Sequence, residues 1–168
     1  PADASNGRIL AFLDHDDRWP PEKLERHRRV HETTDAGLVY SDIVFVDSSD
    51  AHLFRDGLPD VPDTGRPLVK VLFPNGNSTP FSNVTLARRA WDYVVRLDTI
   101  LNLEADCDLW HRLAYKVDFR RVFEFLVFKR VHPNQFSRKH SIEQEELDYN
   151  ISKIVTTYQY LRDLERKK

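Results

Sequence analysis

The stretch Ile9-Leu-Ala-Phe-Leu-Asp-His-Asp-Asp-Arg-Trp-Pro-Pro-Glu-Lys-Leu24 decides the fold, because an apolar run ends abruptly in it at a group of acidic residues. Residues 9–13 form a short, continuous apolar run, which is typical of a strand buried on both faces in a parallel sheet. Pro20 and Pro21 suit the first turn of a helix, where a missing N–H costs nothing. The acidic residues therefore lie between a strand and a helix, where open α/β sheets bind their ligands.

The acidic residues at this junction are Asp14, Asp16 and Asp17. Three carboxylates this close in sequence repel one another unless a positive charge lies between them, and hard oxygen ligands suit Mg²⁺ or Mn²⁺. The sequence thus predicts a divalent metal site. An acidic loop that binds nothing is the alternative, and a bare Asp-x-Asp pattern does not exclude it.

The length and composition are those of one ordinary folded domain, with 168 residues of which 40% are hydrophobic and 11% aromatic. A net charge of −2 and a pI near 6.4 give no electrostatic reason to expect nucleic acid or an anionic membrane as the main partner. Cys107 is the single cysteine, which excludes an intramolecular disulfide framework and indicates a reducing compartment. We therefore expect a cytoplasmic protein, with peripheral attachment at the inner face of the membrane as the alternative.

The chain begins at Pro1 and contains no methionine. A buried parallel strand at 9–13 needs neighbouring strands on both sides, and few residues precede it. We expect the chain to be part of a longer protein, in which a preceding half supplies those neighbours.

The pattern of apolar, β-branched and turn-forming residues predicts the other elements. Residues 21–32 read as a charged helix. Its basic run at 26–29, which includes His27, is expected to form a solvated face, with a phosphate-binding site as the alternative. We expect strands at 38–47, 52–55, 81–86 and 117–131, helices at 88–95 and 106–114, and a loop or seam at 56–67. Trp91 and Trp110 are assigned to the core.

The tail at 141–168 is predicted to be an amphipathic helix. Ser141 and Gln144 form a capping box, and one apolar stripe follows it, made of Leu147, Ile151, Ile154, Tyr158 and Leu161. The stripe suits either packing on the same domain or self-association as a coiled coil, and the sequence leaves both open.

Four motifs in this order resemble family 2 glycosyltransferases of the GT-A fold. They are Gly7 to Leu24 with the Asp-x-Asp sequence, Gly37 to Asp42, Ala105 to Leu113, and Lys129-Arg-Val-His-Pro133. The resemblance covers roughly residues 4–140 and corresponds to the C-terminal portion of such enzymes, without the first half of the nucleotide-binding domain.

The resemblance implies an α/β fold: a partial GT-A (Rossmann-like) mixed sheet flanked by helices, with a long C-terminal helix. It divides the chain into three regions. Residues 1–66 would be the second half of the nucleotide-sugar-binding region, residues 67–140 the acceptor side with the catalytic base, and residues 141–168 the amphipathic helix.

The resemblance also implies a reaction, the inverting transfer of a sugar from a nucleotide donor, with a UDP-sugar expected, to a hydroxyl of a saccharide or lipid-linked acceptor in cell-surface polysaccharide biosynthesis. Asp16 would be the main ligand of Mn²⁺ or Mg²⁺. Asp14 would contact the metal or the ribose of the donor, and Asp17 would be a reserve ligand. His132 would complete the metal site or bind diphosphate, with a plain loop histidine as the alternative. His15 and Trp19 are read as a solvent-facing residue and a wall of the donor pocket.

Asp106 would be the catalytic base in this family's pattern. The chain departs from that pattern at Ala105, where the family has a first acid, and Glu104 is displaced by one residue. Asp108 suits the acidic first turn of a helix better than catalysis. Cys107 is predicted to have no nucleophilic role, because we expect no histidine partner near it.

Two other functions fit parts of the sequence. A strand ending in Asp-x-Asp also opens phosphatases of the haloacid dehalogenase type, but Asp17-Arg-Trp-Pro20 matches them poorly. The other is a degenerate or truncated transferase domain that serves as an assembly module, which Ala105 and the missing donor half favour. For the same reason we expect the chain on its own to be inactive.

Overall fold

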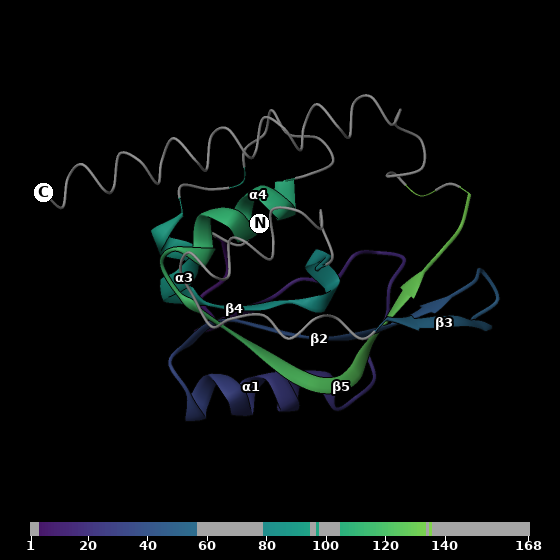
Figure 1. Cartoon of the computed structure of the whole chain (residues 1–168), viewed down its shortest axis with the longest axis horizontal. Helices are drawn as coiled ribbons and strands as arrows, with labels where there is room; N and C mark the ends of the chain where they lie inside the picture. The colour runs from purple at the N-terminus through teal and green to yellow at the C-terminus, as the bar shows by residue number, and fades with distance from the viewer. Residues whose placement is uncertain (1–3, 57–78, 95–96, 98–104, 134, 136–168) are drawn as a thin grey trace, which may run out of the picture.

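A computed structural model of the chain describes residues 4–56, 79–94, 97, 105–133 and 135, and all structural statements below concern these residues. They form a mixed sheet of five strands with helices on both faces (Figure 1). The elements are β1 (Ile9–Ala11), α1 (Lys23–Thr33), β2 (Ala36–Val46), β3 (His52–Asp56), a 3₁₀ turn η2 (Phe81–Asn83), β4 (Thr85–Ala87), α3 (Arg88–Tyr93), α4 (Ala105–Ala114) and β5 (Asp118–Arg130).

The longest pairing in the sheet joins β2 and β5. These two strands run parallel from Ala36 opposite Asp118 to Val46 opposite Arg130. On the other side of β2, the short strand β4 pairs with Leu38 and Val39, and β3 pairs further along as the second strand of a hairpin. The hairpin turn contains Asp50 with a φ of 69°, a left-handed conformation that aspartate tolerates.

The strand directions decide where the functional loops meet. β4 is antiparallel to both β1 and β2, so β1 and β2 run in the same direction, and β5 runs parallel to β2. The carboxyl ends of β1, β2 and β5 therefore open toward one edge of the sheet. This is the edge at which α/β sheets bind ligands.

β1 differs from the prediction of a strand buried on both faces. Only Leu10 of its three residues is buried, Ala11 is exposed, and Leu13 beyond it is 49% exposed. The reason is that β1 pairs with β4 alone among the described strands, so its other edge has no neighbour there. The apolar run does form a strand, but among the described residues it is buried on one side only.

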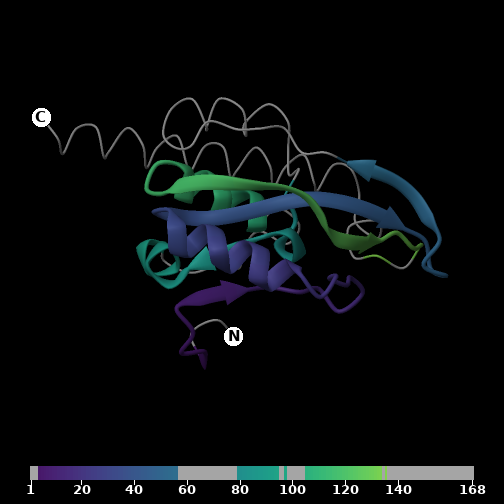
Figure 2. The same ribbon diagram turned by 90° about the horizontal axis from the view of Figure 1, so that it is seen from below.

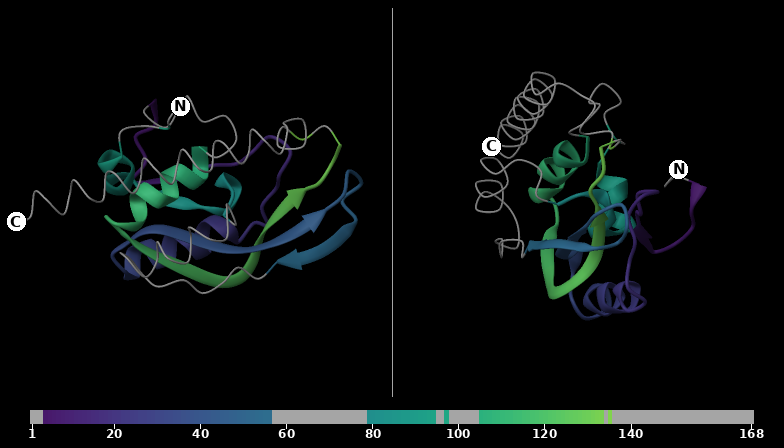
Figure 3. Two further views of the ribbon diagram at one scale, coloured as in Figure 1. Left: turned by 45° about the horizontal axis from the view of Figure 1, so that its top comes forward. Right: turned by 90° about the vertical axis from the view of Figure 1, so that its right-hand side faces the viewer.

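The helices form one layer on each face of the sheet. α1 lies against β2 and β5, and α3 and α4 lie on the opposite face (Figures 1 and 2). Figure 3 shows the same layers from two further directions. Alternate residues of β2 point to opposite faces, so Val39 packs with Val30 of α1 while Leu38 packs with Leu109 of α4.

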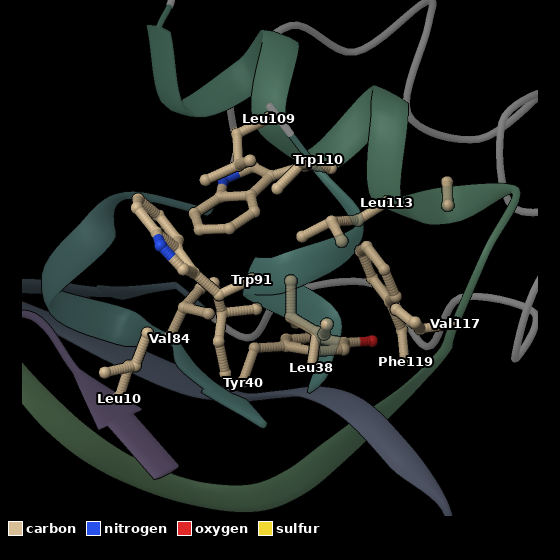
Figure 4. Packing of buried hydrophobic residues seen from close by; sticks show 14 of the residues in the cluster. Leu10, Leu38, Tyr40, Val84, Trp91, Leu109, Trp110, Leu113, Val117 and Phe119 are labelled. Carbon is tan, nitrogen blue, oxygen red and sulfur yellow. The ribbon is translucent and has the colours of Figure 1, made fainter. Parts of the chain in front are cut away.

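The main core lies between the sheet and the pair α3 and α4. Figure 4 shows Trp91 and Trp110 reaching into it from the two helices, above Leu38 and Tyr40 of β2. Both tryptophans are buried, at 7% and 2% exposed, as the sequence predicted. Their burial fixes α4, and with it the position of Asp106.

Gly37 is required by close packing between β2 and the start of β5. A Cβ atom at this position would lie 2.3 Å from Cβ of Val117, far inside contact distance. Any larger residue would force β2 and the segment before β5 apart.

The structure confirms most predicted elements and shifts some of them. The predicted strand at 81–86 is instead η2 followed by β4, because Asn83 and Val84 close a turn onto the carbonyls of Pro80 and Phe81. The predicted helix at 21–32 begins at Lys23, after a turn at Pro20. The loop beyond residue 56 and the amphipathic tail at 141–168 lie outside the described residues.

Candidate active site

Arg130, the last residue of β5, connects the three loops at the carboxyl edge of the sheet. Its Nε donates to the carbonyl of Asp16 at 3.0 Å, and its two terminal nitrogens donate to the carbonyl of Asp47 at 2.8 Å and the carboxylate of Asp50 at 2.7 Å. The loop after β1, the turn after β2 and the end of β5 are thus joined through one guanidinium. No local sequence signal indicates this role, because a strand-end arginine is usually solvated.

Asp16 and His132, which are 116 positions apart in the sequence, meet at this edge. Nε2 of His132 lies 3.1 Å from Oδ2 of Asp16. Partial burial acts to raise the pKa of Asp16, but the hydrogen bond from His132 and the charges of His15 and Lys129 outweigh it, so the pKa lies below its ordinary value. Asp16 is therefore ionised at neutral pH and has a carboxylate available to a cation.

Asp14 lies at the start of the same loop and is exposed, as is His15, which agrees with the solvent-facing position predicted for the histidine. The backbone N–H of Asp14 donates to Oγ of Ser82 at 3.0 Å. The backbone of Asp14 is fixed by this bond while its carboxylate stays open to solvent.

Asp17 has a different environment from the other two acids. Its side chain is 1% exposed, and its Oδ1 accepts a hydrogen bond from the backbone N–H of Arg130 at 2.9 Å. Burial raises the pKa of Asp17, and the charge of Lys129 and the nearby hydroxyl of Ser82 act against that rise. Oδ2 has no hydrogen-bond partner among the described residues, and Lys129 Nζ remains 3.8 Å away. Asp17 therefore joins its loop to β5, and its role as a reserve ligand stays a prediction.

The side chains at this edge suit a magnesium or manganese ion. Asp14 and Asp16 offer carboxylate oxygens, the ligands that these ions prefer, while the imidazole of His132 is a less typical ligand for them. Within the described ranges, no group of three or more acidic, histidine or cysteine side chains is close enough to hold a metal by itself. Such ions commonly take one or two protein carboxylates and complete their shell with phosphate oxygens and water.

Asp106 lies in the first turn of α4 and is half-buried, with Oδ1 accepting from the N–H of Cys107 at 2.9 Å. One turn further along α4, the ring of Trp110 packs edge-on against Phe81 with centroids 5.3 Å apart, and its Nε1 donates to Thr79. Phe81 precedes Ser82, the residue that holds Asp14. α4 thus packs against η2 through Trp110, one helical turn after Asp106.

The residues around Asp106 have structural partners. Asp108 is 2% exposed, and its Oδ2 accepts from Arg112 Nε at 2.8 Å and from a second guanidinium nitrogen at 2.7 Å, which supports its assignment as a structural acid. Cys107 does have a nearby histidine: His111 follows one helical turn later, with its ring nitrogens 3.9 and 4.0 Å from Sγ. The prediction that no such partner lies nearby was wrong, because i and i+4 residues share a helix face. Both residues are buried, so the thiol is enclosed.

His27 also differs from the prediction. It was expected on a solvated face, yet Lys23 and His27 are fully buried, while the neighbouring arginines are exposed. Lys23 Nζ donates to the carbonyl of Asn83 at 2.9 Å and lies 3.2 Å from Nε2 of His27. His27 Nδ1 lies 3.0 Å from Oγ1 of Thr85, and that hydroxyl lies 3.0 Å from Nε2 of His31.

These contacts form a continuous donor and acceptor chain if both histidines are neutral. Lys23 donates to His27, His27 donates to Thr85, the Thr85 hydroxyl donates to His31, and Nδ1 of His31 donates to the carbonyl of Ala36 at 3.2 Å. Burial lowers the pKa of Lys23 to about 7 and that of His27 to about 2, and it also lowers the pKa of His31. The chain anchors α1 to β4 and to η2.

This arrangement predicts acid sensitivity. Unfolded His27 binds a proton below its ordinary pKa of 6.5, whereas the folded residue stays neutral down to about 2, so the unfolded state binds more protons in that window. The free energy of unfolding should therefore fall with decreasing pH, and His27→Gln should reduce this dependence by up to about 1.4 kcal/mol per pH unit near pH 5. Urea unfolding between pH 4 and 7 measures it, with the exposed His15→Gln as the matched control. Equal slopes for wild type and His27→Gln would contradict the buried neutral histidine.

Comparison with known proteins agrees with this architecture. The profile described as Glycosyl transferase family 2 matches residues 2–95, more than half of the chain. A mixed sheet with helices on both faces, whose parallel strands end at one edge, defines the class of α/β proteins. The chain belongs to glycosyl transferase family 2.

The individual proteins that resemble this chain share only low sequence identity with it. A protein of Nostoc sp. described as "Uncharacterized glycosyltransferase alr2836" is 27% identical over 165 residues, which are 95% of this chain and 51% of that protein. The crystal structure of residues 1–349 of S. aureus TarS in complex with UDP superimposes with a TM-score of 0.56 at 12% identity, over 79% of this chain and 38% of that one. A second crystal structure of TarS residues 1–349 gives the same TM-score over 77% of this chain and 37% of that one. At this identity the TarS structures support the fold alone.

The chain spans about half the length of the curated relative it matches. In the described part of the chain, no helix is both long enough and apolar enough to cross a membrane. The three regional divisions at 1–66, 67–140 and 141–168 stay predictions.

Proposed function

We propose that the protein is a metal-dependent, inverting glycosyltransferase that moves a sugar from a nucleotide-sugar donor to an acceptor hydroxyl. The observation that carries the proposal is the pairing of Asp16 with His132 at 3.1 Å, which joins the Asp-x-Asp loop to the end of β5. Membership of glycosyl transferase family 2 supports transfer of a glycosyl group. The complex of TarS with UDP supports a uridine nucleotide as the first donor to test.

The roles of the chain's own residues follow from their exposure and charge. Asp16 and Asp14 would hold Mn²⁺ or Mg²⁺, His132 would bind the diphosphate, and the bound ion would neutralise charge on the leaving diphosphate. Arg130 keeps the loop of Asp16 against β5 through the bond to the Asp16 carbonyl. This holds the carboxylate in position before the donor arrives.

Asp106 would take the proton from the acceptor hydroxyl. A carboxylate held on the opposite side of the sugar carbon from the diphosphate permits in-line displacement, which inverts the anomeric centre. The half-buried position of Asp106 at the start of α4 supports this assignment, because the packing of Trp110 fixes the helix that carries it.

The proposal is tested on the full-length protein by measuring Mn²⁺-dependent hydrolysis and transfer with a panel of nucleotide sugars, UDP-sugars first. We expect release of UDP that is abolished by EDTA and restored by Mn²⁺. Ala105 at the start of α4, where the family pattern has an acid, favours the second candidate, a degenerate domain used for assembly. Absence of hydrolysis, transfer and Mn²⁺-dependent nucleotide binding would support that candidate and reject the enzyme.

A further inference from the structure

η2 is the element that contacts both ends of the Asp-x-Asp loop. The sequence predicted a strand at 81–86 and not this turn. Ser82, its central residue, is fully buried. Oγ of Ser82 accepts the backbone N–H of Asp14 at 3.0 Å, and its carbonyl accepts Nε1 of Trp19 at 2.7 Å. The loop from Asp14 to Trp19 therefore begins and ends on one residue, which lies 68 positions from Asp14 and 63 from Trp19 in the sequence.

η2 is itself held by the interior of the protein. The carbonyl of Asn83 accepts from the buried Lys23 at 2.9 Å. The Asn83 side chain accepts from the N–H and the hydroxyl of Ser41 at 3.2 and 2.9 Å and donates to the Ser41 carbonyl at 2.7 Å. These bonds leave little freedom for the backbone at Ser82, so the residue is a fixed point for the loop.

The middle of the loop is fastened from the other direction, by β5. The backbone groups of Arg18 and Phe128 exchange two hydrogen bonds, of 3.1 and 2.9 Å, and Asp17 accepts from the N–H of Arg130. Between the bond at Asp14 and the bond at Asp17, the side chains of Asp14 and His15 are exposed and that of Asp16 is partly exposed. β5 fixes the Asp16 end of this outward segment, and the bond to Ser82 fixes the Asp14 end.

We propose that Ser82 is a positioning residue for the metal and donor site: its hydroxyl fixes the backbone of Asp14, so that the Asp14 and Asp16 carboxylates are held together before a metal and nucleotide bind. This inference rests on the proposed function. Groups that orient metal ligands typically change metal affinity by about 10- to 100-fold when they are removed. Ser82 acts through Asp14 and does not itself contact the ligand.

The test is the affinity of the full-length protein for Mn²⁺ in the presence of UDP, measured by titration calorimetry. Ser82→Ala removes the acceptor for Asp14 and leaves the carbonyl that binds Trp19. We expect its dissociation constant for Mn²⁺ to rise by about tenfold or more. Hydrogen exchange of the peptide containing Asp14 should also accelerate without any ligand, which reports the lost bond directly.

The matched control is Thr85→Val, which removes another buried hydroxyl three residues away. The Thr85 hydroxyl bonds to His27 and His31, on the α1 side of the sheet and away from the acidic loop. We expect this variant to lower the melting temperature at least as much as Ser82→Ala while leaving Mn²⁺ affinity within about twofold, because the Thr85 hydroxyl contacts no proposed metal ligand or its backbone. A purely structural role for Ser82 would make the two variants alike in both measurements.

The outcomes separate this inference from the proposed function. If the wild-type protein binds no Mn²⁺ with UDP, the proposed function fails and this inference fails with it. If the wild type binds and Ser82→Ala matches Thr85→Val in affinity, only the positioning role is overturned. If Ser82→Ala does not fold, Ser82→Cys serves as the second variant, because a thiol fills similar space and is only a weak acceptor for the N–H of Asp14. A folded Ser82→Cys protein with wild-type Mn²⁺ affinity overturns the proposal, and a several-fold loss supports it.

Discussion

Replacing Asp106 by asparagine is expected to lower the rate of sugar transfer by about 100- to 10,000-fold, the usual contribution of a general base. Asparagine keeps the shape of the side chain and its ability to accept the N–H of Cys107, so α4 should remain intact. It cannot take a proton from the acceptor hydroxyl. Binding of UDP with Mn²⁺ should therefore change little, because Asp106 is assigned to the acceptor and not to the donor.

The measurement is a comparison of turnover and of UDP affinity in the full-length protein, with Asp92→Asn as the control. Asp92 is an exposed aspartate on α3, so its replacement makes the same charge change away from the site. A variant of Asp106 that transfers sugar at the wild-type rate would remove it from the role of base. Glu104, which lies outside the described residues, would then be the next residue to test.

Replacing Asp16 by alanine is expected to give the opposite pattern. It removes the carboxylate that pairs with His132 and is assigned as the main metal ligand, so Mn²⁺-dependent binding of UDP should weaken by more than about 100-fold, beyond the effect of losing an orienting group. Transfer should fall with it, because the donor is no longer held. The Asp16 backbone carbonyl still accepts from Arg130, so the loop should keep its anchor to β5.

The neighbouring exposed residue supplies the control for Asp16. His15→Ala changes the same loop at a position whose side chain lies in solvent, and its Mn²⁺ affinity should stay within a few-fold of wild type, as expected for a side chain outside the ligand set. The two aspartates can then be compared directly. If Asp106→Asn abolished metal-dependent binding while Asp16→Ala abolished only turnover, the assignment of metal ligand and base would have to be exchanged.

Elements with a strong local pattern were predictable from the sequence. The β-branched run before Asp47 became β2, the long apolar run before His132 became β5, and Trp110 with Leu113 marked the buried face of α4. Local patterns suffice here because a run of such residues has to bury one or both faces. β1 was predicted with the wrong burial, since coverage of a strand depends on neighbours that its own residues do not specify.

The polar interior was not predictable in the same way. Lys23 and His27 lie in a charged segment that reads as solvated, yet they are buried because Asn83 and Thr85 supply partners from another part of the chain. The free energy cost of burying such groups is met only when those partners are present. A sequence pattern read locally contains no information on partners that are 58 or 60 positions away.

The acidic loop shows most clearly which features the local sequence determines and which depend on the tertiary structure. The sequence by itself determined that Asp14, Asp16 and Asp17 follow a strand and precede a helix, because strand, breaker and helix signals are local. Only the tertiary structure decided that Asp17 turns inward to Arg130, that Asp16 meets His132, and that Ser82 holds Asp14. The physical reason is that these bonds join residues between 68 and 116 positions apart, so they exist only after β5 and η2 have packed beside the loop.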